Sequence, residues 1–96
     1  MSISITKCAV IGAGTMGSGI AFVSATAGIE AFQVDVKQEQ LDRARAYHKK
    51  TADRAVEKKR MTQVEADAAL ARIHYVTAMD QAKGAQWVIE AATENV

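Results

Sequence analysis

The sequence predicts an α/β fold in which helices cover a parallel sheet. The first observation is a short apolar segment, residues 7–11, that ends at a group of glycines and precedes a stretch of small apolar residues. The second is a long charged segment with no glycine between Gly28 and Gly84, in a chain without proline, which favours helices over turns. Strands alternating with helices are typical of parallel sheets. The 96 residues suffice for one small domain.

Composition and two glycines mark the first strand, the first helix and the second strand. Residues 7–11 indicate a buried strand, and residues 16–27 are small and apolar enough for a helix that packs on a sheet. Gly28 follows as the cap of this helix, because glycine enters the left-handed region without steric cost. Residues 31–34 indicate a second strand that ends at Asp35. The unit is a βαβ crossover, which predicts two parallel strands.

Residues from about 37 to 73 are predicted to form an αα-hairpin that protrudes from the α/β unit. Its first helix begins near Gln38 and is mostly solvated, with few apolar residues among dense charges. These apolar residues are Leu41, Ala44, Ala52, Ala55 and Val56. The second helix begins at Thr62, where Thr62 and Glu65 have the spacing of a capping box. Its apolar positions, which fit one helix face only loosely, are Val64, Ala68, Leu70, Ala71 and Ile73.

Two more strands are expected after the hairpin. Residues 75–76 indicate a short third strand, and residues 87–92 indicate a further one, with Trp87 packed in the core or at an edge. Cys8, in the first strand, is expected to be a small buried hydrophobic residue.

Bulk composition excludes several classes of protein. The net charge of +1 gives no reason to expect nucleic acid or an anionic membrane as a partner. No apolar run approaches the roughly 20 residues that span a bilayer, and the first residues lack the pattern of a signal peptide. A single cysteine fits a reducing compartment. We therefore expect a cytoplasmic protein.

The glycines form the motif G-x-G-x-x-G at residues 12–17, between the first strand and the first helix. Gly12 permits a tight turn, Gly14 lets the backbone approach a pyrophosphate, and Gly17 lets helix and strand pack closely. The intervening residues are Ala13, Thr15 and Met16. Amides that open the helix have no partner within it and can bind phosphate. The motif predicts a dinucleotide-binding turn in a partial Rossmann domain, with a doubly wound parallel sheet and an αα-hairpin after the second strand.

Asp35, at the end of the second strand, follows Gly17 by 18 residues, close to the spacing of about 20 typical of a ribose-binding acid. A carboxylate there accepts hydrogen bonds from the ribose hydroxyls and repels a 2′-phosphate, so NAD is favoured over NADP. The nearby Lys37 could weaken that preference. The alternatives are a glycine-rich turn of another α/β protein and an aspartate that caps a helix.

Several segments together resemble the start of the 3-hydroxyacyl-CoA dehydrogenase family. They are AVIGAGTMGSG at residues 9–19, Val34 with Asp35, the charged hairpin, and VIEAATEN at residues 88–95. The resemblance covers essentially the whole chain. It implies an enzyme that oxidises the 3-hydroxyl of an acyl-CoA to a ketone with hydride transfer to NAD, in fatty-acid β-oxidation or related routes.

The same resemblance implies roles for individual residues. Residues 12–17 match the pyrophosphate turn, Asp35 the acid of the adenosine ribose, and Glu94 a glutamate that lies along the cofactor. Thr51 and Lys58 match positions where the hairpin touches coenzyme A. The family's catalytic histidine and glutamate, and the C-terminal helical domain through which its members dimerise, are expected beyond Val96. Residues 1–96 are thus expected to be the N-terminal part of an NAD-binding domain, inactive alone, from a homodimeric parent.

Other interpretations of the same features stay open. Residues 49–60 carry a net charge of +4, and Thr51, Arg54 and Lys58 share one helix face, which is either a coenzyme A contact or a solvated surface. The chain could also belong to a dehydrogenase of free 3-hydroxy acids or to a non-catalytic dinucleotide-binding module. His48 and His74 have no potential ligands at metal-binding spacing and are expected to be solvated or partly packed.

Overall fold

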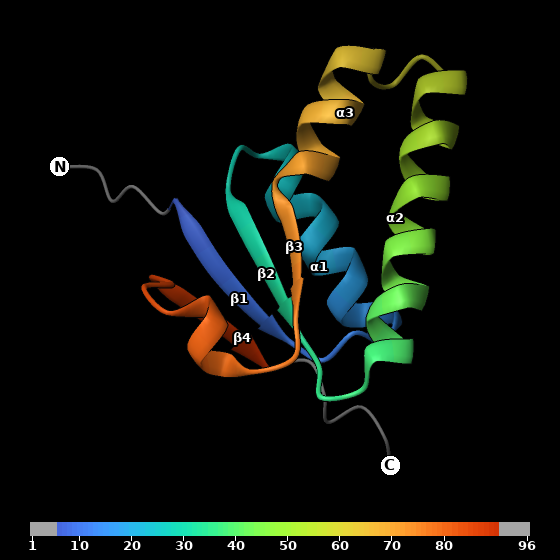
Figure 1. Ribbon diagram of the computed structural model, residues 1–96. Coiled ribbons are helices and arrows are strands. Elements are labelled where there is room, and N and C mark those ends of the chain that lie inside the picture. Colours follow the sequence, from blue (N-terminus) through green and yellow to red (C-terminus); the bar gives the residue numbers. More distant parts are fainter. Residues whose placement is uncertain (1–5, 91–96) are drawn as a thin grey trace, which may run out of the picture.

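The computed structural model describes residues 6–90 and has the predicted α/β architecture (Figure 1). Its sheet holds four parallel strands in the order β3-β2-β1-β4. The strands are β1 (Lys7–Ile11), β2 (Glu30–Val34), β3 (Ile73–Val76) and β4 (Trp87–Glu90). The helices are α1 (Thr15–Thr26), α2 (Gln38–Glu57), α3 (Gln63–Ala71) and the short 3₁₀ helix η1 (Met79–Ala82).

The strand order places a change of direction between β1 and β4. From β1 the chain steps outward through α1 to β2 and through α2 and α3 to β3, and then returns past β1 by way of η1 to β4. The three α-helices lie on one face of the sheet and η1 on the other (Figure 1). Open α/β sheets bind ligands at the carboxyl ends of the strands where the order reverses. Here that place is the end of β1, followed directly by the glycines.

Side chains of the central strand alternate between two small cores. Cys8 and Val10 pack with Ala21 of α1 and Ala31, whereas Ala9 packs on the opposite face with Val34 and Ala82 of η1. Cys8 is fully buried, as predicted.

The predicted boundaries of the first half are confirmed to within one residue. β1 spans the expected residues, and α1 begins and ends one residue earlier than predicted. Gly28 has a φ of 92° and directly follows the C-cap residue Ala27, so the expected left-handed glycine is present. β3 is two residues longer than expected, and η1 was not predicted.

The hairpin begins its second helix as predicted, but it packs more closely than expected. The Thr62 amide donates to Glu65 Oε1 at 2.8 Å, and the Glu65 amide donates to Thr62 Oγ1 at 3.1 Å. Rather than protruding, α3 packs on α1 through a cluster that contains Ala25, Ala69 and Ile73. Small residues at this contact let the two helices approach. The predicted apolar face of α3 is therefore wrong: Ala66 and Ala69 are buried, and Val64 is 78% exposed.

The last strand is the least covered part of the described sheet. β4 is present over residues 87–90 as predicted, and the expected residues 91–92 lie outside the described chain. Trp87 and Val88 are about half exposed, so Trp87 packs at an edge. None of the helices in the described part has the length and apolarity needed to cross a membrane.

Candidate cofactor-binding site

Two glycines of the turn after β1 have the geometry that the motif predicts. Gly12 has a φ of 106°, a conformation that residues with a Cβ rarely adopt. A Cβ on Gly17 would lie 2.2 Å from the carbonyl oxygen of Gly12, so only glycine lets α1 pack this closely on the turn. Gly14, the N-cap residue of α1, has an extended conformation open to any residue. Its predicted role therefore depends on the space above the backbone.

The carbonyl groups of the turn are all bonded within the protein. Gln33 Nε2 donates to the Gly12 oxygen at 3.4 Å, and Ser18 Oγ donates to the Ala13 oxygen at 3.3 Å. The backbone amide of Ser18 donates to the Gly14 oxygen at 2.9 Å. By contrast, the first amides of α1 have no partner within the helix, and no side chain caps them. The turn thus offers donors outward and keeps its acceptors inward, as an anion site requires.

Asp35 lies beside the turn at the carboxyl end of β2. Its Oδ2 accepts a hydrogen bond from the Ala13 amide at 3.1 Å, and its Oδ1 accepts one from the Lys37 amide at 2.9 Å. These two bonds fix the carboxylate while leaving it partly exposed. The structure therefore brings together Asp35 and the glycine turn, which the sequence predicted to act on one ligand.

A hollow of about 240 Å³ lies between the turn and the first half of α2. The turn and α1 contribute Ala13, Gly14, Thr15 and Ser18, and α2 contributes Gln40, Arg43, Ala44 and Tyr47. The sequence did not predict a role in the site for these α2 residues, although their spacing is that of one helix face. Arg43 adds an exposed positive charge beside the turn.

A buried polar cluster contacts the turn from the interior of the protein. Gln33 and His48 are fully buried, and Ser18 is 2% exposed. His48 Nε2 lies 2.8 Å from the Ser18 carbonyl oxygen, which only accepts, so Nε2 carries the proton. In the neutral ring Nδ1 then accepts from the Tyr75 hydroxyl at 2.7 Å. Burial lowers the pKa of His48, against the opposing effect of its bond to Ser18. Burial also raises the pKa of Tyr75 to about 12, although the positive charge of Arg45 acts to lower it.

The prediction that His48 is solvated or partly packed was wrong. His48 belongs to the one buried stripe of α2, with Leu41, Ala44 and Ala52, because these residues recur at helical spacing. Of the other apolar residues predicted for this helix, Ala55 and Val56 are only half-buried. His74 is partly packed, as expected: it stacks on Phe32, and its Nε2 lies 2.6 Å from Glu30 Oε1. Within residues 6–90, no three potential ligands gather at a metal-binding distance.

The predicted substrate residues lie far from the turn. Thr51 is half-buried, and Lys58 is the exposed C-cap residue of α2. In Figure 1 the starts of α1 and α2 lie together at the lower end, whereas the end of α2 lies at the top. Lys58 is 15 residues beyond Arg43, which is roughly 22 Å along a helix. Glu94, the remaining predicted cofactor residue, lies outside the described residues.

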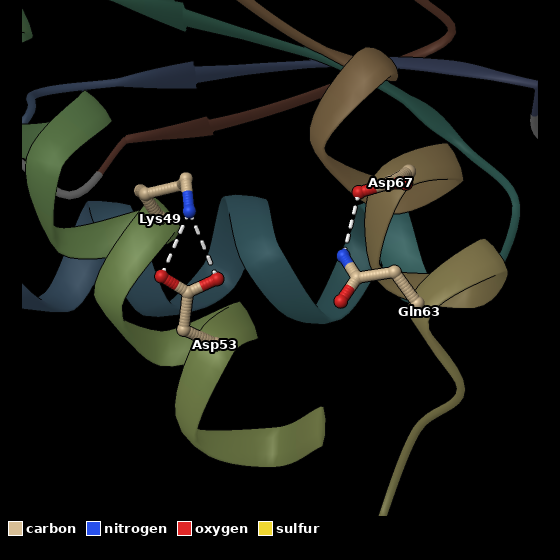
Figure 2. Close-up of polar contacts among 4 residues, drawn as sticks. All are labelled: Lys49, Asp53, Gln63 and Asp67. Carbon is tan, nitrogen blue, oxygen red and sulfur yellow. Dashed lines mark hydrogen bonds and ion pairs between the residues drawn. The ribbon is translucent and has the colours of Figure 1, made fainter. Parts of the chain in front are cut away.

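Two polar pairs on the outer surface of the hairpin each join residues one helical turn apart. Figure 2 shows Lys49 Nζ between the two carboxylate oxygens of Asp53, at 2.9 and 2.8 Å, one helical turn away. On α3, Gln63 Nε2 donates to Asp67 at 2.9 Å in the same way (Figure 2). Asp53 thus pairs with Lys49 on the same helix.

Comparison with known proteins gives a consistent assignment. Residues 7–96 match the family model described as 3-hydroxyacyl-CoA dehydrogenase, NAD binding domain. The 3-hydroxybutyryl-CoA dehydrogenase of Mycobacterium tuberculosis is 38% identical over 95 residues, covering 99% of this chain and 33% of that protein. The fatty acid oxidation complex subunit alpha of a Psychrobacter species is 37% identical over 91 residues, covering 95% of this chain and 13% of that protein.

A solved structure shows the same arrangement. The crystal structure of (S)-3-hydroxybutyryl-CoA dehydrogenase from Ralstonia eutropha has a TM-score of 0.90 and 39% identity, covering 97% of this chain and 33% of that one. The chain therefore spans a third or less of the length of these relatives. On the match of residues 7–96 to the family model, the chain belongs to the family of NAD-binding domains of 3-hydroxyacyl-CoA dehydrogenases.

Proposed function

We propose that the chain supplies the cofactor-binding part of an NAD-dependent 3-hydroxyacyl-CoA dehydrogenase. The observation that carries this proposal is the sorting of polar groups in the glycine turn, where the carbonyls of residues 12–14 are bonded inward. A dinucleotide pyrophosphate is an anion, and it would meet amides at the start of α1 with the positive end of the helix dipole. The relatives named 3-hydroxybutyryl-CoA dehydrogenase support the choice of reaction.

Each residue of the cofactor site has a distinct task in this proposal. The amides of Thr15, Met16 and Gly17 bind the pyrophosphate, and Gly14 leaves room for it. Asp35 accepts hydrogen bonds from the ribose hydroxyls, oriented by its bonds to the Ala13 and Lys37 amides. Glu94 lies along the cofactor. Bound NAD supplies the acceptor for the hydride that leaves the 3-hydroxyl carbon of the substrate.

The hairpin is proposed to bind the coenzyme A part of an acyl-CoA. Thr51 would form one hydrogen bond, and Lys58 would meet a phosphate as a mobile point charge. The net positive charge of residues 49–60 supports this role. Contacts so far from the reacting carbon contribute binding and orientation only.

The wider setting is proposed on the family assignment. Residues 1–96 form the N-terminal part of the NAD-binding domain, with the hairpin at about 37–73. The catalytic residues and a C-terminal helical domain that makes a homodimer belong to a longer, cytoplasmic parent enzyme. No role for nucleic acid or membrane is proposed. The 96-residue chain is expected not to reduce acetoacetyl-CoA with NADH, because proton transfer needs an oriented acid or base.

The test is calorimetric titration of the wild-type protein with NADH and with NADPH. We expect saturable binding of NADH and weaker binding of NADPH. Gly14→Val should abolish NADH binding while leaving the far-UV circular dichroism unchanged, because the branched side chain would occupy the space of the pyrophosphate. A wild-type protein that fails to bind NADH, or a Gly14→Val variant that binds it equally well, contradicts the proposal.

A further inference from the structure

A glutamine occupies a position in the sheet where an aliphatic residue would pack without cost. Gln33 lies in β2, between β1 and β3, and is fully buried under α1. Its Nε2 has two acceptors, but its Oε1 has no hydrogen-bond partner. A buried polar atom without a partner destabilises a fold. Strands buried on both faces ordinarily carry valine, isoleucine or leucine, so the donor of Gln33 must supply something that an aliphatic side chain cannot.

What the Gln33 donor supplies is a restraint on the turn. Its Nε2 lies 3.4 Å from the Gly12 oxygen and 3.1 Å from Ser18 Oγ, and Ser18 Oγ in turn donates to the Ala13 oxygen at 3.3 Å. Gly12 carries a positive φ, and glycine does not hold its own conformation, because many backbone angles are open to it. The Gly12–Ala13 peptide group is thus held at its oxygen by Gln33 and at its N–H by Asp35, and the Ala13–Gly14 peptide group is held at its oxygen by Ser18.

We propose that Gln33 and Ser18 are positioning residues of the dinucleotide site, which keep the carbonyl oxygens of Gly12 and Ala13 away from the phosphates of the cofactor. This inference rests on the proposed function. If either peptide group rotated, a carbonyl oxygen would face the pyrophosphate and repel it. With both oxygens bonded inward, the cofactor meets only N–H groups, and the turn needs no rearrangement when the cofactor binds.

Helix α2 holds Ser18 in place from the other side. His48 Nε2 donates to the Ser18 carbonyl at 2.8 Å, and Tyr75 of β3 fixes the other ring nitrogen at 2.7 Å. Ser18 is thus held by its hydroxyl on one side and by its carbonyl on the other. The restraint on the turn extends through His48 to the hairpin.

The inference predicts that affinity and stability respond differently to one substitution. Gln33→Met keeps the length and the burial of the side chain but removes both the Nε2 donor and the unpartnered oxygen. We expect the dissociation constant for NADH to rise about five- to tenfold, as for the loss of one hydrogen bond. The melting temperature should stay within a few degrees of wild type. A residue that only supports the fold would lower the melting temperature and leave NADH affinity unchanged.

Serine substitutions give a second test with a matched control. Ser18→Ala removes the hydroxyl that holds the Ala13 oxygen and should also weaken NADH binding several-fold. Ser24→Ala is the control, because Ser24 is a buried serine of the same helix whose side chain bonds to Cys8 instead of the turn. It should leave NADH affinity unchanged. If Gln33→Met fails to fold, the two serine variants decide the question.

The outcomes separate this inference from the proposed function. Wild-type protein that does not bind NADH would overturn both. Wild-type protein that binds NADH, with Gln33→Met and Ser18→Ala binding it equally well, would overturn the positioning role alone. Equal weakening by Ser18→Ala and Ser24→Ala would also overturn it, since buried hydroxyls would then matter only for the helix.

Discussion

The two faces of α2 carry two different kinds of polar group. On the inner face, the buried His48 belongs to a cluster whose hydrogen bonds link β2, α1, α2 and β3. On the outer face, Lys49 and Asp53 are exposed and bond to each other one helical turn apart (Figure 2). Burying a polar group lowers the stability of a fold unless hydrogen bonds fix its geometry, whereas exposed ion pairs add little stability. The inner face is built for a fixed ligand geometry, and the outer face can contribute charge without defined orientation.

The largest expected effect is at Gly17. Gly17→Ala would place a Cβ 2.2 Å from the Gly12 oxygen, so the turn must shift. Overpacking costs about 1–3 kcal/mol of stability. Displacing two amides from a charged phosphate would cost about 3 kcal/mol or more, which is at least roughly 100-fold in NADH affinity.

Gly19→Ala is the control for this substitution. A Cβ on Gly19 meets no atom within 4 Å, so NADH affinity should stay at the wild-type value in calorimetry. Loss of binding in both variants, or in neither, would mean that close packing at Gly17 does not shape the site.

The second effect concerns cofactor choice at Asp35. The carboxylate and a 2′-phosphate would repel each other by about 2 kcal/mol after solvent screening, roughly 30-fold in relative affinity. Asp35→Ala should therefore bring the dissociation constants for NADH and NADPH close together, because it relieves the repulsion of NADPH and removes the hydrogen bonds to the ribose of NADH. Equal binding of the two cofactors by the wild-type protein would show that Asp35 does not distinguish the ribose of NADH from that of NADPH.

A third effect sharpens the contrast between the buried and the exposed polar groups. Burial lowers the pKa of His48 from its ordinary value of 6.5, so the unfolded chain takes up a proton at this residue before the folded chain does. Stability should consequently fall as the pH drops through 6.5. Urea unfolding at pH 7.5 and at pH 5.5 measures the fall, and His48→Leu should reduce it. Both proteins carry His74, so the comparison isolates the contribution of His48. A variant with the wild-type pH dependence would exclude His48 as the cause.

The smallest effect is expected on the hairpin. In the full-length enzyme, Lys58→Ala should raise the Michaelis constant for an acyl-CoA several-fold, or about 1 kcal/mol, and more at low salt. NADH binding should not change. Lys49→Ala is the matched control, because Asp53 already pairs with Lys49. If both substitutions change the Michaelis constant equally, or if Lys58→Ala does not change it, this surface is only a solvated helix face.

The contrast also explains what the sequence could predict. Gly12, Gly17 and Gly28 were recognised because each meets a local backbone demand that other residues rarely satisfy. The capping box at Thr62 and Glu65 could be predicted as well, because it depends on residues only three apart in the sequence. Gln33 and His48 could not be assigned, because their partners depend on strand register and on how α2 lies against α1. The apolar face of α3 was mispredicted for the same reason, since contact with α1 selects alanines over Val64.

The central claim, that NADH binds at the turn and not at residues 49–60 of the hairpin, is tested most directly by backbone amide NMR during NADH titration. We expect the largest shift changes at residues 14–17, with smaller changes near Asp35. Residues 49–60 at the far end of α2 should keep their positions in the spectrum. Shift changes centred on residues 49–60, or amides of residues 14–17 unaffected at saturating NADH, would contradict it.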